Sequence, residues 1–173
     1  MLIEEMTDQE SVDVLTRTRL GRLACAHGSQ PYVVPFYYAY HDYYLYAFTT
    51  VGQKIEWMRE NPLVCAQVDE IVSSEEWRSV IVYGRYEELP DTPEWHFQRE
   101  FAWKLLQSYG MWWQPALAKT SYPGVQLPRI PVFYRISADR VTGHRATVDP
   151  KERVARTSRK VPKKRGWLHW LYK

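Results

Sequence analysis

The sequence has very few of the residues that crosslink small proteins or bind structural metals. Only two of its 173 residues are cysteine, Cys25 and Cys65, and both lie in apolar runs typical of strands. Neither is part of a CxxC pair, so the sequence offers no disulfide framework and no zinc-finger spacing. The five histidines include no HExxH pair. We therefore expect neither disulfide bonds nor a metal site.

Long apolar runs are missing as well. No stretch of about 18 consecutive apolar residues occurs, so the sequence predicts no membrane-spanning helix. The first residues, MLIEEMTDQE, are acidic and lack the apolar core of a secretion signal. The sequence contains no GxSxG motif and no Ser-His-Asp order, so nothing in it indicates a nucleophilic hydrolase. These absences favour a cytoplasmic protein whose two cysteines serve core packing.

Aromatic residues, in contrast, are abundant, at 15% of the chain with 13 Tyr and 8 Trp. An apolar fraction of 45% is enough for one domain with a single sizeable core. Aromatic side chains favour strands, and flat rings can also line a pocket for a flat ligand. We interpret most of them as core residues of a β-rich domain.

Charge is distributed unevenly along the chain. The segment 151–173 contains nine Lys or Arg and one acidic residue, so it carries +8 and residues 1–150 carry −5. This asymmetry predicts a domain at 1–148 followed by a basic, aromatic tail at 149–173. Such a tail can be solvated, can dock on a partner subunit, or can bind nucleic acid or an anionic membrane surface. Because residues 1–150 are acidic, we favour docking or solvation of the tail over binding to nucleic acid.

The predicted order of elements is helix, three strands, short helix, two strands, helix, and one or two final strands. We expect the first three strands to form an antiparallel meander. Many short antiparallel strands with helices outside them indicate an α+β barrel and argue against a parallel doubly wound sheet. The helices are predicted at 6–21, 52–62 and 91–110, and the strands at 21–27, 32–40, 43–50, 63–70, 75–89 and 130–143.

A few residues predict special points within these elements. Thr7 and Glu10 have the spacing of a capping box at the start of the first helix. Pro35 cannot donate a ladder hydrogen bond, which indicates an edge strand or a bulge. Gly84 indicates a bend in the longest strand. In the third helix, Thr92 can cap the start, Pro93 fits the first position, and Gly110 can end it.

The stretch YLYAFTTVGQK, residues 44–54, combines hydroxyls, a glycine and a lysine at a strand-to-helix corner. If Gly52 opens the helix, the first free N–H groups and the helix dipole can bind an anion. Thr49 and Thr50 add hydroxyl donors, and Lys54 adds a positive charge that suits a phosphate. A capped helix with a solvated lysine is the alternative that these residues leave open.

Four segments, in this order, resemble the pyridoxamine-phosphate-oxidase-like flavoproteins, the FMN-binding split barrels, and most closely their nitroimidazole-reductase-like branch. The resemblance runs from about Met6 to about Gly143. It implies an α+β protein with an antiparallel split β-barrel of Greek-key type and peripheral helices. The segments are LGRLACAHGSQPYVVPFYYAY, LYAFTTVGQKIEWMRENPLVCAQVD, WRSVIVYGRYEEL and VTGHR.

The resemblance also implies a homodimer with FMN at its interface. The residues implied to contact the flavin ring or ribityl chain are Val34, Pro35 and Phe36. Those implied to lie along the ribityl phosphate are Phe48, Thr49, Thr50, Gln53 and Lys54. Those implied to come from the partner chain are Arg78 and Ser79.

The activity that the resemblance implies is that of an oxidoreductase. A reduced nicotinamide would pass hydride to FMN, and FMN would reduce a small aromatic or nitro substrate. Relatives that bind flavin, deazaflavin or haem without turnover leave a binding or storage role open. We assign no catalytic side chain, because the cofactor carries the electrons. The chain departs from the family at Thr49 and His144, and segment 111–129 matches no motif, serving as a substrate wall or a lid.

Overall fold

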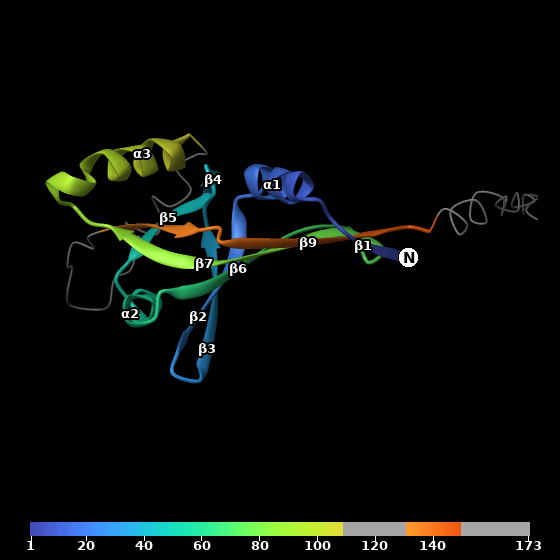
Figure 1. Cartoon of the computed structure of the whole chain (residues 1–173), viewed down its shortest axis with the longest axis horizontal. Coiled ribbons are helices and arrows are strands. Elements are labelled where there is room, and N and C mark those ends of the chain that lie inside the picture. Colours follow the sequence, from blue (N-terminus) through green and yellow to red (C-terminus); the bar gives the residue numbers. More distant parts are fainter. Residues whose placement is uncertain (109–130, 150–173) are drawn as a thin grey trace, which may run out of the picture.

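The computed structural model describes residues 1–108 and 131–149. These residues form a nine-stranded, antiparallel sheet flanked by three α-helices (Figure 1). The strands are β1 (Leu2–Glu5), β2 (Leu20–His27), β3 (Gln30–Tyr37), β4 (Ala39–His41), β5 (Tyr44–Thr50), β6 (Leu63–Ser73), β7 (Glu76–Leu89), β8 (Pro131–Ser137) and β9 (Arg140–Thr147). The helices are α1 (Asp8–Arg17), α2 (Gln53–Glu60) and α3 (His96–Gln107), with a 3-10 turn at Pro93–Trp95 before α3.

The strands pair in the order β3-β2-β6-β7-β8-β5-β4, and β9 pairs with β7 and with β1. The two ends of this path, β3 and β4, are consecutive in the chain and are joined through Tyr38. The chain therefore links the two ends covalently, while no ladder of hydrogen bonds closes the sheet within the described residues. The predicted α+β, antiparallel class is confirmed, and the arrangement is consistent with a split barrel. The Greek-key type stays a prediction.

The predicted meander of the first three strands is found with one change. The predicted second strand, 32–40, is divided at Tyr38 into β3 and β4, so that β3 forms a hairpin with β2 and β4 forms a hairpin with β5. The turn between β4 and β5 lies at Asp42 and Tyr43, both of which have positive φ. Because of the division, β3 and β4 lie at opposite ends of the strand path, and the other edge of β5 pairs with β8.

Gly84 is the point at which β7 changes partners. The first part of β7 pairs with β9, and its last four residues, Tyr86–Leu89, pair with β8. A Cβ atom at Gly84 would lie 1.6 Å from the carbonyl oxygen of Ser137, so only glycine permits this close approach. The glycine at which a bend or bulge was predicted is thus the point where the sheet divides into two parts that share β7.

Other local predictions had mixed outcomes. The capping box of α1 is present, since the Thr7 N–H donates to Glu10 Oε2 at 2.9 Å and the Glu10 N–H donates to Thr7 Oγ1 at 3.3 Å. Pro35 lies on the edge strand β3, as predicted. Pro93 opens the 3-10 turn, but the side chain of Thr92 makes no capping hydrogen bond, so that predicted cap is wrong.

The strand β1 was not predicted. Its acidic sequence has no apolar alternation, and its conformation depends on pairing with β9, which aligns Leu2 with Thr147. The main core lies among β2, β3, β5, β6, β7 and β8, and Tyr38 and Tyr134 are its largest fully buried side chains. A second, smaller apolar cluster lies beneath α3 and includes Leu89.

Three predictions fall outside the described residues: Gly110 as the end of the third helix, the segment 111–129, and all of the tail at 149–173 except its first residue. In the ranges that the structure describes, no helix has the length and apolar character needed to cross a membrane. The same ranges contain no group of three or more His, Cys, Asp or Glu side chains arranged to hold a metal ion.

Candidate functional site

The corner between β5 and α2 exposes unpaired backbone donors. Gly52 is the N-cap of α2, and a Cβ atom at this position would meet nothing within 4 Å. The N–H groups of Ile55 and Glu56 donate to the Gly52 carbonyl oxygen at 2.9 and 3.2 Å. Within the described residues, the N–H groups of Gln53 and Lys54 have no protein acceptor. Two free donors therefore point out of the first turn of α2 into open space.

Lys54 adds a cation to these donors. Its side chain is half-buried, and this burial lowers the pKa of its ammonium group, while Cys25 acts electrostatically in the opposite direction. No carboxylate of the described residues forms an ion pair with Lys54 or shifts its pKa. A cation that is partly removed from water without a counter-ion costs free energy. A bound anion would offset that cost.

The two threonines of the corner lie on opposite faces of β5, because side chains alternate along a strand. Thr49 shares its face with Leu45 and Ala47, which belong to the main core. Thr50 shares its face with Phe48, which packs against the cluster beneath α3. Both threonines are half-buried, and neither hydroxyl makes a hydrogen bond within the described residues. The sequence alone had treated the two hydroxyls as equivalent.

Thr49 is the threonine on the same side as Lys54. Ile55, the residue after Lys54, is fully buried in the main core. Cys25, which acts on the charge of Lys54, belongs to the same core and is 5% exposed. The candidate anion site therefore consists of the first turn of α2, the Lys54 ammonium and the Thr49 hydroxyl.

The three predicted residues of β3 do not share one face. Val34 and Phe36 point inward, whereas Pro35 is exposed on the outer face. Phe36 is 4% exposed, and its ring stacks on that of Tyr38 with 5.4 Å between the ring centroids. Val34 is half-buried, so it is the inner side chain of this group with accessible surface. Phe48 is engaged elsewhere, with its ring 5.6 Å from that of Phe133.

Arg78 and Ser79 lie away from the corner, on the part of β7 that pairs with β9 (Figure 1). Arg78 Nη1 is 3.5 Å from Glu70 Oε2 on β6. The Ser79 hydroxyl accepts a hydrogen bond from Gln67 Nε2 at 3.2 Å. The structure of one chain therefore does not bring these two residues to Lys54, and their predicted role as residues from a partner chain stays a prediction.

Sequence reasoning missed an aromatic cluster next to the corner. Trp57 lies one turn after Lys54 on α2, and its ring centroid is 5.5 Å from that of His27 and 5.5 Å from that of Tyr32. His27 Nδ1 is 2.8 Å from Glu60 Oε2. The spacing of Lys54 and Trp57 in a predicted helix was a usable signal, because residues three apart are neighbours on a helix surface.

A buried hydroxyl behind the corner was also missed. Tyr134 is fully buried, and its hydroxyl has no hydrogen-bond partner within the described residues. Burial raises the pKa of this hydroxyl, and Cys25 contributes to the rise. No sequence signal identifies such a group, because strand alternation shows that a tyrosine faces inward but not whether its oxygen meets a partner.

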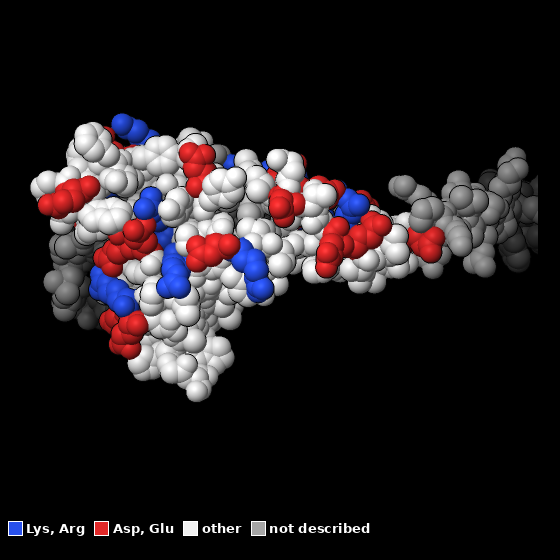
Figure 2. All heavy atoms as spheres, in the orientation of Figure 1, with Lys and Arg blue, Asp and Glu red and all other residues white. Residues whose placement is uncertain are grey.

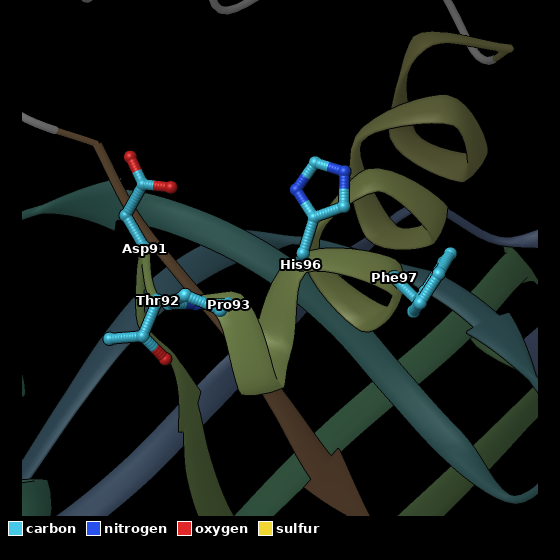
Figure 3. Close-up of a pocket in the computed structure, with 5 residues that line it drawn as sticks. All are labelled: Asp91, Thr92, Pro93, His96 and Phe97. Carbon is cyan, nitrogen blue, oxygen red and sulfur yellow. The ribbon is translucent and has the colours of Figure 1, made fainter.

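The hollow shown in Figure 3 is a different place. It is open to solvent at the start of α3, and its lining residues are Asp91, Thr92, Pro93, His96 and Phe97. Asp91 is 3.7 Å from Arg99, and His96 is 3.9 Å from Glu100. None of the residues predicted for the cofactor site lies in this hollow, and its side chains form no converging donor set.

Charged groups on the surface are largely paired with each other. In Figure 2, Lys and Arg lie beside Asp and Glu across the visible face. Arg17, for example, is 2.5 Å from Glu70, and Arg59 is 2.8 Å from Glu88. Lys54 differs from these residues, because no carboxylate in the described part of the chain neutralises its charge.

Comparison with known proteins agrees with this fold. A family model described as pyridoxamine 5'-phosphate oxidase matches residues 7–145. An uncharacterised protein of Rhizobium meliloti (strain 1021) is 40% identical over 146 residues, which cover 84% of this chain and 97% of that protein. The crystal structure of a FAD-binding protein from Mesorhizobium loti is 47% identical, with a TM-score of 0.71, and the match covers 85% of this chain and all 100% of that one.

A more distant solved structure is that of the FAD and heme binding protein from Mycobacterium smegmatis. It is 16% identical to this chain, with a TM-score of 0.60, and the match covers 88% of this chain and 79% of that one. At this level of identity the likeness concerns the fold alone.

Proposed function

Because this chain belongs to the pyridoxamine 5'-phosphate oxidase family, we propose that it binds a flavin nucleotide at the corner between β5 and α2. The observation that carries the proposal is Lys54, a half-buried ammonium without a carboxylate partner in the described residues, beside two free N–H groups. The relative from Mesorhizobium loti, described as FAD-binding at 47% identity, supports a flavin. FMN, the cofactor expected from the sequence, is also the flavin-bearing half of FAD.

The groups at the corner fit the phosphate of such a nucleotide. The two N–H groups and the ammonium only donate hydrogen bonds, and the Thr49 hydroxyl can donate one, so the set suits an anion. The open space at Gly52 admits a phosphate close to the backbone. Glu56, the acidic residue of the first turn, is exposed and does not shift the pKa of Lys54.

Each residue then has a defined task. Lys54 and the N–H groups of α2, including that of Gln53, bind the phosphate, and Thr49 donates to it from the core side. Val34 lies along the ribityl chain or ring with Phe36 buried behind it, and Pro35 contributes through its backbone because its ring points outward. The remaining residues of the predicted set act from the far face of β5 or from a second subunit: Phe48, Thr50, Arg78 and Ser79.

We also propose a homodimer in which the flavin lies at the subunit interface and the protein is an oxidoreductase. The bound flavin supplies hydride transfer between a reduced nicotinamide and a small aromatic or nitro substrate. The chain's own residues hold and orient the cofactor. The proposed requirement for the partner's residues explains why one chain leaves Arg78 and Ser79 far from the corner.

A role in binding or storing a flavin, a deazaflavin or haem without turnover is the second candidate. The observation in its favour is that no carboxylate of the described residues is coupled to Lys54, so the corner offers anion donors without an acid–base pair. Steady-state oxidation of NADH or NADPH with added electron acceptors separates the two functions. Tight flavin binding without turnover would favour storage.

The test of flavin binding uses the absorbance spectrum of the purified protein, followed by titration with FMN and with riboflavin, which lacks the phosphate. Lys54→Met should weaken FMN binding at least tenfold and leave riboflavin binding nearly unchanged. Lys104→Met is the matched control, since Lys104 lies on α3, exposed and 3.4 Å from Glu100. Equal FMN affinity of the wild type and Lys54→Met would contradict the assignment of the phosphate site.

A further inference from the structure

The aromatic cluster beside the corner consists of His27, Tyr32 and Trp57, and we call it the α2 aromatic cluster. The His27 ring is tilted by 31° against the Trp57 ring, and the Tyr32 ring meets Trp57 edge-on at 63°. These rings come from both strands of the β2–β3 hairpin and from α2. The cluster is therefore a place where three elements meet, next to the helix whose first turn carries the free N–H groups.

The cluster lies on the same side of α2 as Lys54. Trp57 follows Lys54 by three residues, which places the two side chains as neighbours about one helical turn apart. Tyr32 is aligned with Cys25 across the β2–β3 hairpin, and Cys25 is near enough to Lys54 to act on its charge. A ligand whose phosphate is bound at Lys54 can therefore extend along α2 onto these rings.

The imidazole ring of His27 is the most accessible ring of the cluster, and an interaction with Glu60 fixes its position. The His27 side chain is 55% exposed, and its Nδ1 is 2.8 Å from Glu60 Oε2 on the last turn of α2. Trp57 and Tyr32 are partly buried against the main core. Core packing explains the inner surface of these two rings, but it does not explain a histidine fixed over an indole at the surface.

We propose that the α2 aromatic cluster binds the purine base of a dinucleotide flavin, so that the preferred ligand of the corner is FAD and not FMN. The inference rests on the proposed function, because it extends from the phosphate at Lys54. The base stacks on the exposed face of the His27 imidazole and along the edge of Trp57, where flat aromatic surfaces accept any base through its π-face. The diphosphate lies at the corner, near Lys54, and the base extends from it.

Glu60 acts in this arrangement as a positioning residue. It contacts His27, not the ligand, and keeps the imidazole over Trp57. FMN ends at its phosphate and has no group that reaches the cluster. The cluster therefore discriminates between the two flavins, whereas Lys54 serves both.

The test compares the affinities of FAD, FMN and ADP for the full chain, the flavins by fluorescence quenching and ADP by calorimetry. We expect FAD to bind about tenfold more tightly than FMN, and ADP to bind measurably. Trp57→Leu keeps an apolar side chain but removes the aromatic face and should remove the FAD preference, whereas Trp57→Phe should retain most of it. His27→Ala and Glu60→Gln should lower FAD affinity without changing that of FMN.

The control is Phe97→Ala, which removes an exposed ring on α3 and should leave all three affinities unchanged. Equal affinity of the wild type for FAD and FMN would overturn the inference while leaving the proposed function intact. The inference is also overturned if Trp57→Leu, with an unchanged melting temperature, weakens both flavins equally. If neither flavin binds, the proposed function fails, and ADP decides the purine site: binding that His27→Ala abolishes supports it, and no binding overturns it.

Discussion

The carboxylate of Glu88 on β7 accepts two hydrogen bonds from the guanidinium of Arg59 on α2, each 2.8 Å long. The Tyr86 hydroxyl donates a third hydrogen bond to the same carboxylate at 2.9 Å. A bidentate pair of this kind fixes orientation as well as distance. Arg59 lies in the last turn of α2, so this pair ties the end of the helix to β7 while the first turn remains open.

Replacing Glu88 by Gln should therefore destabilise the protein modestly. The side chains are 45% exposed for Arg59 and 28% exposed for Glu88, so solvent screening limits the loss to about 1 kcal/mol. The hydrogen bonds from Arg59 hold the pKa of Glu88 below its ordinary value. A lowered pKa means that this stabilisation is fully present above pH of about 4.3 and is lost as the pH falls through the pKa of the folded state.

The measurement for this prediction is urea unfolding of the wild type and Glu88→Gln at pH 7 and at decreasing pH. The two proteins should differ in the free energy of unfolding at pH 7 and converge in acid. Glu100→Gln, which removes an exposed carboxylate on α3, is the control. A Glu88→Gln variant no less stable than Glu100→Gln would show that the pair does not hold α2.

Two buried tyrosines offer a second prediction, because they differ in hydrogen bonding. The Tyr38 hydroxyl lies 2.6 Å from Thr18 Oγ1 and 3.1 Å from the Leu15 carbonyl oxygen, whereas the Tyr134 hydroxyl is unpaired within the described residues. Tyr38→Phe should cost about 1 kcal/mol, and Tyr134→Phe should be neutral or stabilising. Thermal and chemical unfolding of both variants check this. A comparable loss in Tyr134→Phe would reveal a partner for its hydroxyl.

Gly84, where β7 changes its partner from β9 to β8, supports a third prediction. Gly84→Ala would push a methyl group into the Ser137 carbonyl and should cost more than about 3 kcal/mol or prevent folding. Gly52→Ala is the matched substitution, since a Cβ atom there meets nothing within 4 Å. Melting temperatures and circular dichroism of the two variants provide the comparison. A stable Gly84→Ala protein would be incompatible with the observed approach of β7 to β8.

The two threonines of the corner give a fourth prediction. Thr49→Val keeps the shape of the side chain and removes the hydroxyl on the Lys54 side, so FMN affinity should fall about five- to tenfold. Thr50→Val removes a hydroxyl from the opposite face of β5 and should have the smaller effect. Titration with FMN and riboflavin measures both. A larger loss in Thr50→Val would place the phosphate on the α3 side.

Local signals in the sequence predicted local structure well. The capping box of Thr7 and Glu10, the edge position of Pro35 and the bend at Gly84 each follow from neighbouring residues. The pairing of β1 with β9 and that of β5 with β8 were not predictable, because strand partners far apart in sequence are selected by the whole fold. The division of the predicted second strand into β3 and β4 was missed for the same reason.

In the candidate site, too, the local features were predictable from the sequence and the long-range contacts were not. The residues of the corner are contiguous from Thr49 to Lys54, so sequence spacing alone brought them together. Strand alternation puts the two hydroxyls on opposite faces of β5, but which face meets the main core depends on the whole fold, and the meeting of His27 with Trp57 depends on how α2 packs against the β2–β3 hairpin. A single sequence contains no signal for that packing.

The pairing of β1 with β9 also has a consequence for how the protein is made. Among the described strands, β1 emerges first during synthesis and its one partner among them, β9, emerges last. One edge of β7 likewise stays unpaired until β8 and β9 have been synthesised. Long-range pairing of this kind is slow and leaves strand edges exposed. A nascent chain that has not yet extended to residue 147 therefore leaves the backbone N–H and C=O groups of β1 without their native hydrogen-bond partners.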